Sequence, residues 1–161
     1  MGILDQLIDD IGDNKKKLTD LLDQTLKKRE HFLTEVKKLY ADVERWLAPL
    51  IKSIVQDPVN KPATTTLTDA AGLYEAPLLS LDSEKFTLRL SPLDWHVYSA
   101  DGKALLVIGE RERTLLLRDD GWYIAEEQGE DYVYKKVNRK NLTELIEMAQ
   151  KNLKKQKESE N

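Results

Sequence analysis

The sequence contains no cysteine among its 161 residues. Disulfide bonds, thiolate nucleophiles and zinc sites with sulfur ligands are therefore excluded, and a chain without cysteine suits a reducing cytoplasm. No apolar run approaches the roughly 18 residues that a membrane-spanning helix needs. The first residues show neither the basic region nor the apolar stretch of a signal peptide. We therefore expect a soluble cytoplasmic protein that does not associate with membranes.

The sequence also lacks the short motifs that identify common enzyme classes. It has no glycine-rich phosphate loop, no Gly-x-Ser-x-Gly elbow and no His-Glu-x-x-His pair, and it contains only two histidines. Its acidic pairs at 119–120, 126–127 and 130–131 flank predicted turns, where solvation alone favours carboxylates. We expect no enzymatic activity, no metal and no cofactor.

Positive charge is scarce where nucleic acid would need it. The net charge is −4, and residues 58–137 carry nine Lys and Arg against fourteen Asp and Glu. Phosphate contacts require the opposite balance. The basic runs at 15–17, 27–29 and 37–38 alternate with acidic residues at helical spacing, as in Asp23 and Lys27, which is typical of a solvated helix face. Nucleic-acid binding through these helix lysines is therefore the weakest functional hypothesis.

The first 57 residues have a helical period. Apolar residues from Ile3 to Ile11 predict a short helix that ends at Gly12. Three columns then recur every seven residues, beginning at Leu18, Leu22 and Leu26, with Thr25 and Arg29 as polar members. Columns at three of every seven positions form a stripe wide enough to be buried on two sides. The pattern predicts a second, long helix over residues 14–48.

This long helix is too long for its domain. No Gly or Pro interrupts residues 14–48, so an unbroken helix would span about 52 Å. A compact domain of this chain length measures roughly 40 Å across. Either the helix bends near Thr25–Arg29, or another chain covers the apolar surface that overhangs. We favour the second alternative, because exposed apolar surface of that size promotes aggregation.

The period changes to two after residue 72. Residues 58–72 contain two prolines and a threonine cluster, which predicts a connector. Strands are predicted at 73–81, 85–90, 95–99, 103–109, 114–117, 122–125 and 132–137, separated by turn signals such as Ser91-Pro92 and Asp101-Gly102. Such short turns favour an antiparallel meander. Residues 104–108 are apolar on both faces, which predicts a central strand covered on both sides.

The last predicted element is a helix. Its apolar stripe consists of Leu142, Leu145, Ile146, Ala149 and Leu153. The chain is thus predicted to form one α+β domain over residues 1–161, with a helical segment (1–57), the connector (58–72), an antiparallel sheet of six or seven strands (73–137) and a C-terminal helix (138–157).

The overhanging stripe leads to the main functional hypothesis. We expect a non-enzymatic protein-interaction or regulatory domain that acts as a homodimer through its long helix, with an unidentified protein partner as a further possibility. The residues expected to pack against the second subunit are Phe32, Val36, Leu39, Val43 and Trp46. Each would contribute roughly 1.5–3 kcal/mol when fully buried.

The alternative hypothesis is a small-ligand site in the concave face of the meander. Its candidate residues are Trp95, His96, Tyr98, Trp122 and Tyr123. On a strand, Asp94, His96 and Tyr98 would share one face, where a carboxylate beside an imidazole can orient a ligand. A polar strand face with Trp95 in the core is the simpler interpretation of the same residues.

Overall fold

The N-terminal half of the chain is dominated by one long helix. The computed structural model describes residues 2–50, 63–83, 86–97 and 100–159, with the backbone alone for residues 152–159. Helix α1 (Ile3–Leu47) is followed by a short 3-10 helix, η1 (Ala48–Leu50). The predicted break at Gly12 is wrong, and α1 also continues through Thr25–Arg29. One glycine costs only about 1 kcal/mol inside a helix, which is too little to end it.

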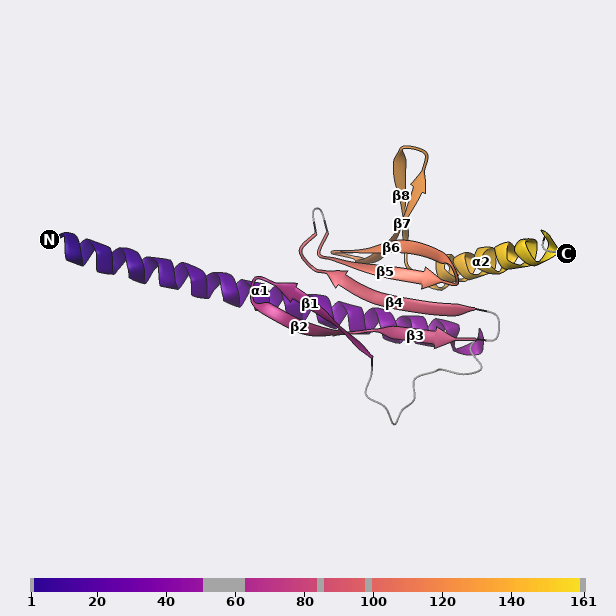
Figure 1. Cartoon of the computed structure of the whole chain (residues 1–161), viewed down its shortest axis with the longest axis horizontal. Coiled ribbons are helices and arrows are strands. Elements are labelled where there is room, and N and C mark those ends of the chain that lie inside the picture. Colours follow the sequence, from indigo (N-terminus) through magenta and orange to yellow (C-terminus); the bar gives the residue numbers. More distant parts are fainter. Residues whose placement is uncertain (1, 51–62, 84–85, 98–99, 160–161) are drawn as a thin grey trace.

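The fold is α+β, as the sequence predicted. A two-stranded sheet contains β1 (Thr64–Asp69) and β2 (Gly72–Pro77). A six-stranded antiparallel sheet contains, in chain order, β3 (Leu79–Asp82), β4 (Thr87–Asp94), β5 (Gly102–Ile108), β6 (Arg111–Arg118), β7 (Gly121–Gln128) and β8 (Asp131–Lys136). Each of these strands pairs with the next, and helix α2 (Arg139–Ser159) follows. Figure 1 shows α1 extending far beyond both sheets at its N-terminal end.

The first difference from the predicted strands is the β1–β2 hairpin. Strand β1 lies within the predicted connector, where three consecutive threonines favour an extended chain, and it pairs with β2 from Thr64↔Pro77 to Asp69↔Gly72. The predicted strand 73–81 is in fact two strands with different partners, because Pro77 lacks the N–H that would continue the ladder. Residues 51–62 lie outside the described residues.

The second difference concerns the predicted turn at Ser91-Pro92 and the predicted strand 95–99. Strand β4 continues through Pro92 to Asp94, with a register shift between these two residues. The pairing of β4 with β3 ends at Leu90. Pro92, which has no N–H group, is therefore not required to donate a hydrogen bond to β3. The chain then leaves the sheet, and Trp95 and His96 lie in a loop rather than in a strand.

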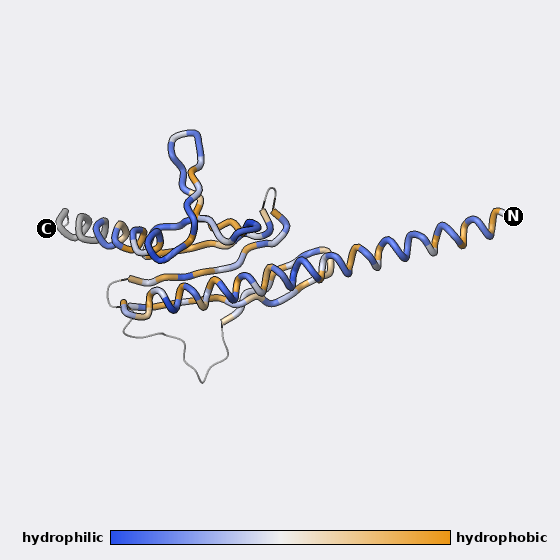
Figure 2. Tube along the Cα trace, turned by 180° about the vertical axis from the view of Figure 1, so that it is seen from behind, coloured by the Kyte–Doolittle hydropathy of each residue, from blue (hydrophilic) through white to orange (hydrophobic). Residues whose placement is uncertain are grey.

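Both helices pack on the same face of the six-stranded sheet. The buried residues of this core are Phe32, Val36, Leu39, Tyr40, Val43 and Leu47 of α1, Leu142, Leu145, Ile146 and Ala149 of α2, and the alternate residues of the strands, such as Ala104, Leu106 and Ile108 of β5. Leu105 and Val107, on the other face of β5, are only half-buried. The prediction that β5 is covered on both faces is therefore wrong. Figure 2 shows that hydrophobic positions recur along the whole of α1.

A close contact between α1 and β5 fixes the distance of the helix from the sheet. The ring of Phe32, which is fully buried, lies directly over Gly102. A Cβ atom at Gly102 would lie 2.8 Å from Cδ1 of Phe32 and 3.4 Å from Cβ of Leu117. Only a residue without a side chain allows the helix to approach this closely.

We expect Gly102→Ala to destabilise the protein by about 1–3 kcal/mol, because the added methyl group must displace a packed ring. Urea unfolding followed by circular dichroism measures this change. Gly12→Ala is the matched control, since a Cβ at Gly12 meets no atom within 4 Å and alanine favours the helix. Equal stability of the Gly102 variant and the wild type would show that the contact is not tight.

Candidate functional site

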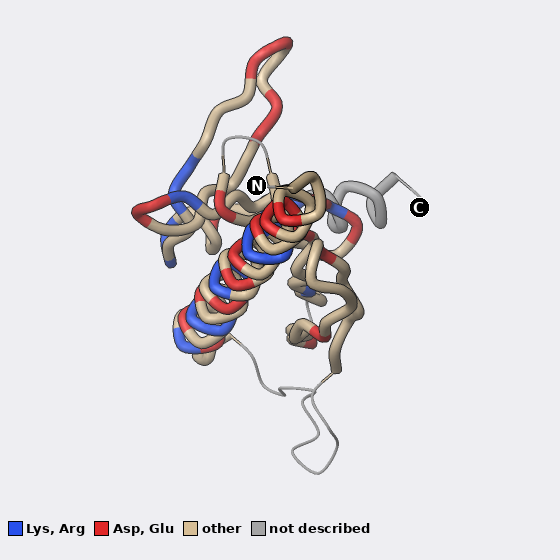
Figure 3. The backbone as a smooth tube through the Cα atoms, turned by 90° about the vertical axis from the view of Figure 1, so that its left-hand side faces the viewer, with Lys and Arg blue, Asp and Glu red and all other residues tan. Residues whose placement is uncertain are grey.

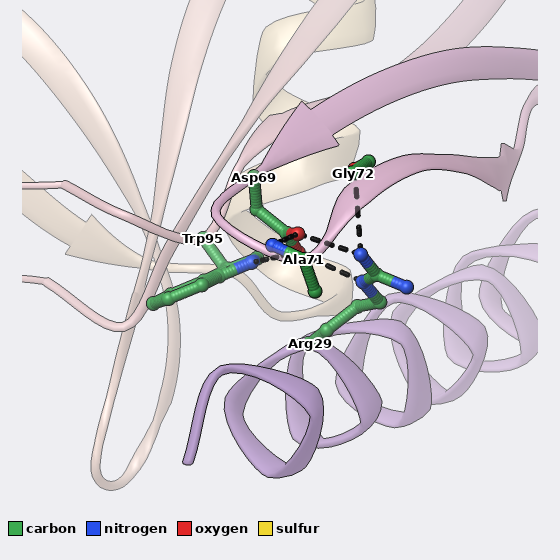
Figure 4. Close-up of polar contacts among 5 residues, drawn as sticks. All are labelled: Arg29, Asp69, Ala71, Gly72 and Trp95. Carbon is green, nitrogen blue, oxygen red and sulfur yellow. Dashed lines mark hydrogen bonds and ion pairs between the residues drawn. The ribbon is translucent and has the colours of Figure 1, made fainter. Parts of the chain in front are cut away.

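The carboxylate of Asp69 lies where α1, the β1–β2 turn and the loop after β4 meet (Figure 4). Arg29 donates to both of its oxygens, from Nε to Oδ2 at 2.7 Å and from Nη2 to Oδ1 at 2.6 Å. Trp95 Nε1 donates to Oδ2 at 3.0 Å, and the backbone N–H of Ala71 donates to Oδ1 at 2.8 Å. The side chain of Asp69 is only 2% exposed. We call Arg29, Asp69 and Trp95 the Asp69 clamp, because their hydrogen bonds join three segments that are distant in sequence.

The clamp keeps both of its charges at neutral pH. The hydrogen bonds from Arg29 lower the pKa of Asp69 to about 2; burial opposes this lowering, and the hydrogen bonds from Trp95 and Ala71 add to it. The pKa of Arg29 is raised, above all by the same hydrogen bonds. The guanidinium also lies over the ring of Tyr74, with Cζ 4.5 Å from the ring centroid. A buried ion pair of this kind is stable only when its hydrogen bonds are satisfied, as they are here.

Two grooves include Trp95 and His96 in their lining. The first has a volume of about 330 Å³, and its lining includes Leu21, Thr25, Ala70 and Trp95. The second has a volume of about 410 Å³ and is lined by His31, His96, Lys27, Lys28 and Trp95, among others. We call them the arm-base groove and the histidine groove. Both volumes lie in the range of small-ligand sites.

The histidine groove brings together both histidines of the chain. The imidazole of His96 packs edge-on against the Trp95 ring at 5.5 Å between centroids, and Lys28 Nζ lies 5.9 Å from the centroid of the Trp95 ring system. Asp94 Oδ1 accepts from the backbone N–H of His96 at 2.9 Å. This carboxylate thus contacts the main chain of the loop. His31 was not singled out from the sequence, because it lies 65 positions before His96.

Only two of the predicted ligand-binding residues lie together. Trp95 and His96 are adjacent in the loop, and Tyr98 lies outside the described residues. Trp122 and Tyr123 lie on opposite faces of β7: Trp122 packs in the core against Phe32 and donates from Nε1 to the carbonyl of Glu35 at 3.3 Å. Tyr123 is on the uncovered face, where its hydroxyl donates to Asp120 and thereby raises its pKa. Trp122 and Tyr123 therefore cannot form one site with Trp95 and His96.

The predicted interaction residues of α1 are also placed differently. Phe32, Val36, Leu39 and Val43 are at most 3% exposed, and Trp46 packs at the edge of the same core. They cannot contact a second subunit without leaving their own sheet, so their assignment to a subunit interface is wrong. The physical reason is that the sheet covers the C-terminal half of the stripe, which the sequence pattern does not distinguish from the N-terminal half.

The overhang of α1 lies at its other end. Every residue from Gly2 to Gln24 is exposed, and Thr25 is the first buried residue. We call Ile3–Gln24 the exposed arm. Its large apolar residues, with their exposed fractions, are Ile3 (81%), Leu4 (74%), Leu7 (50%), Ile8 (65%), Ile11 (54%), Leu18 (59%), Leu21 (52%) and Leu22 (36%). The arm is therefore a helix with an uncovered apolar stripe.

Two members of the clamp were not predicted to be important. Arg29 stands in a column with Leu22 and Val36, and a cation in a buried column signals a buried anion. That signal is present in the sequence, but Arg29 served there only to mark where a bend would occur, which was the alternative not favoured. Asp69 gave no comparable signal, because its partner lies 40 residues away and its turn resembles an ordinary connector.

Comparisons with other proteins add no relative. No family model matches the chain, and no curated protein or solved structure matches it either. Among the described residues, no three His, Cys, Asp or Glu side chains are grouped so that they could hold a metal ion. No helix in this part of the chain is long and apolar enough to cross a membrane.

We expect Asp69→Asn to destabilise the protein by about 2–3 kcal/mol, because it leaves the Arg29 charge largely buried without its counter-ion. The wild type should also lose stability between about pH 4 and pH 2. A carboxyl with a lowered pKa stabilises the fold above its ordinary pKa, and this stabilisation is lost as the pH falls through the folded value of about 2.

Urea unfolding at pH 7, 4, 3 and 2 measures both effects. The Asp69→Asn variant should lose less stability between pH 4 and pH 2 than the wild type, because it lacks the titrating group. Asp20→Asn, on the exposed arm, is the matched control and should behave as the wild type. A wild-type and an Asp69→Asn protein with the same pH profile would contradict the assigned role of Asp69.

Proposed function

We propose that the protein is a non-enzymatic interaction protein that acts as a homodimer, and that its exposed arm forms the interface. The observation that carries this proposal is the uncovered apolar stripe of the arm. The arm spans about 33 Å at 1.5 Å per residue, and eight large apolar residues along it are at least 36% exposed. An apolar surface of this extent marks a site of association.

The stability of the arm as a helix supports the same proposal. Most helical stability in proteins comes from the packing of an amphipathic face, and the arm, exposed from Gly2 to Gln24, has no such packing within its own chain. The arm also contains Gly12, which costs about 1 kcal/mol relative to alanine. A partner that covers the stripe would supply the missing packing, at roughly 1.5–3 kcal/mol for each large side chain that becomes fully buried.

The spacing of the stripe favours another helix as the partner. Leu4, Ile8, Ile11, Lys15, Leu18 and Leu22 follow one another at alternating steps of four and three residues. This is the repeat by which two helices pack along their length. A second copy of the chain carries the same stripe and is always available, so it is the simplest partner.

The hydrogen bonds of the Asp69 clamp indicate that its charged residues have a structural role. Asp69 accepts from Arg29, Trp95 and Ala71, and both of its oxygens are engaged. The clamp lies within one helical turn of Thr25, where the exposed arm meets the body. We infer that the clamp holds the arm at a defined direction for association.

Ile11→Asp should convert the dimer into a monomer, because it places a charge in the middle of the stripe. Light scattering coupled to size-exclusion chromatography at micromolar concentration measures the mass. Gln6→Asp is the matched control: it adds the same carboxylate to the arm at a position outside the stripe, and it should remain dimeric. A wild type that is monomeric in this measurement would refute the proposal.

The histidine groove favours a second candidate function, the binding of a small anionic ligand. Lys27, Lys28, His31 and His96 converge there beside the ring of Trp95. Cationic side chains around an aromatic surface suit a ligand that carries a phosphate or carboxylate.

Titration with inorganic pyrophosphate, followed by tryptophan fluorescence, tests this second candidate. We expect a saturable change, and about tenfold weaker binding in Lys28→Gln, since one charge-assisted contact is worth about 1.5–3 kcal/mol. Lys37→Gln is the control, because Lys37 is exposed on α1 outside the groove. Lack of a saturable change, or equal loss in both variants, would reject this site for pyrophosphate.

A further inference from the structure

The charges of α1 are distributed unevenly along the arm. The outer half of the exposed arm, residues 3–13, carries four aspartates and no Lys or Arg, whereas the inner half, residues 14–24, carries three lysines against two aspartates. Figure 3, seen from the N-terminal end, shows acidic positions at the tip of α1 and alternating basic and acidic positions behind them. The exposed arm thus has a strongly acidic outer half and an inner half in which lysines exceed aspartates by one.

This asymmetry distinguishes the two ways in which identical arms can pair. In a parallel pair, the four aspartates of one arm would lie at the level of the same four of the other, and Lys15 of the stripe would face Lys15 of the second copy. In an antiparallel pair, each acidic half lies at the level of an inner half that is nearly neutral, and Lys15 faces an apolar residue. Like charges across a helix interface disfavour an arrangement, and opposite charges favour it.

We propose that two copies of the chain pair antiparallel through their exposed arms, with the tip of each arm at the base of the other. This inference rests on the proposed homodimer and adds the orientation and register of the pair. The register follows from the stripe: Leu4 packs opposite Leu22 of the second copy, and Ile8 packs opposite Leu18. The two-fold axis passes near Asp13.

The same register accounts for the polar residues of the arm. Lys15 lies opposite Ile11 of the second copy, where its aliphatic stem covers the apolar side chain and its ammonium group reaches solvent. The side of each arm that faces away from the second copy carries the charged residues Asp9, Asp10, Lys16 and Lys17, which remain in solvent. Lys15 therefore disfavours other alignments of the two arms, in which its ammonium group would face Lys15 of the second copy or be buried in the interface.

The shape of the body is compatible with this arrangement. All residues from Gly2 to Gln24 are exposed, so two arms can overlap along their length without contact between the bodies, which lie at opposite ends. The tip of the second copy then reaches the arm-base groove, whose lining includes Leu21, Thr25, Ala70 and Trp95. Ile3 and Leu4, with exposed fractions of 81% and 74%, are suitable apolar side chains to occupy it.

Cross-linking of single-cysteine variants tests the orientation, because the chain has no cysteine of its own. The variants are Leu4→Cys and Leu22→Cys, each first checked for the dimeric mass by light scattering. In an antiparallel pair, position 4 of one copy lies about 27 Å along the helix axis from position 4 of the other copy. This distance is beyond the reach of a short thiol-specific cross-linker, and the same holds for position 22. We therefore expect neither variant to cross-link alone, and the two variants, co-expressed with different tags, to cross-link to each other.

The outcomes separate the two proposals. Cross-linking of Leu4→Cys with itself would overturn the antiparallel orientation while the homodimer stands. A dimeric mass without any cross-link between Leu4→Cys and Leu22→Cys would overturn the register. A monomeric wild type would overturn the homodimer and the orientation together.

Discussion

The ion pair between Arg29 and Asp69 is the interaction on which the rest of the structure depends. It joins α1 to the β1–β2 hairpin, and through Trp95 it also joins the hairpin to the loop after β4. Because these groups are largely withdrawn from water, each needs the others to satisfy its hydrogen bonds. The clamp lies close to the point where α1 leaves the body, because Thr25, the first buried residue of the helix, precedes Arg29 by about one helical turn.

The consequence is that one continuous stripe serves two purposes. From Phe32 to Leu47 the stripe lies against the sheet, and the approach is close enough that Phe32 requires a glycine at position 102. From Ile3 to Leu22 the same stripe is uncovered. A helix that is amphipathic over its full length but buried over only half of it presents a surface for association, and this is the physical basis of the proposed homodimer.

Several features could be predicted from the sequence because they depend on local periodicity. The α+β class, the antiparallel meander and the stripe of α2 follow from the change between a helical period and a period of two. The errors have local causes as well. A run of threonines beside prolines resembles a loop although it forms β1. Pro92 resembles a turn residue although it lies within β4, in the part of that strand that no longer pairs with β3. The candidate site was predicted only in part: Trp95 and His96 line the grooves, whereas Trp122 and Tyr123 do not.

The sequence by itself determined that α1 is longer than a compact domain and apolar along one side, because helical rise and spacing are properties of the chain alone. Only the tertiary structure decided which half of that stripe is buried, since every turn of the helix offers the sheet a similar apolar face. The choice comes from contacts between residues distant in sequence: Phe32 with Gly102, Arg29 with Asp69, and Asp69 with Trp95. Such contacts have no periodic signature, and so the free end of the helix could be located only once the sheet was in place.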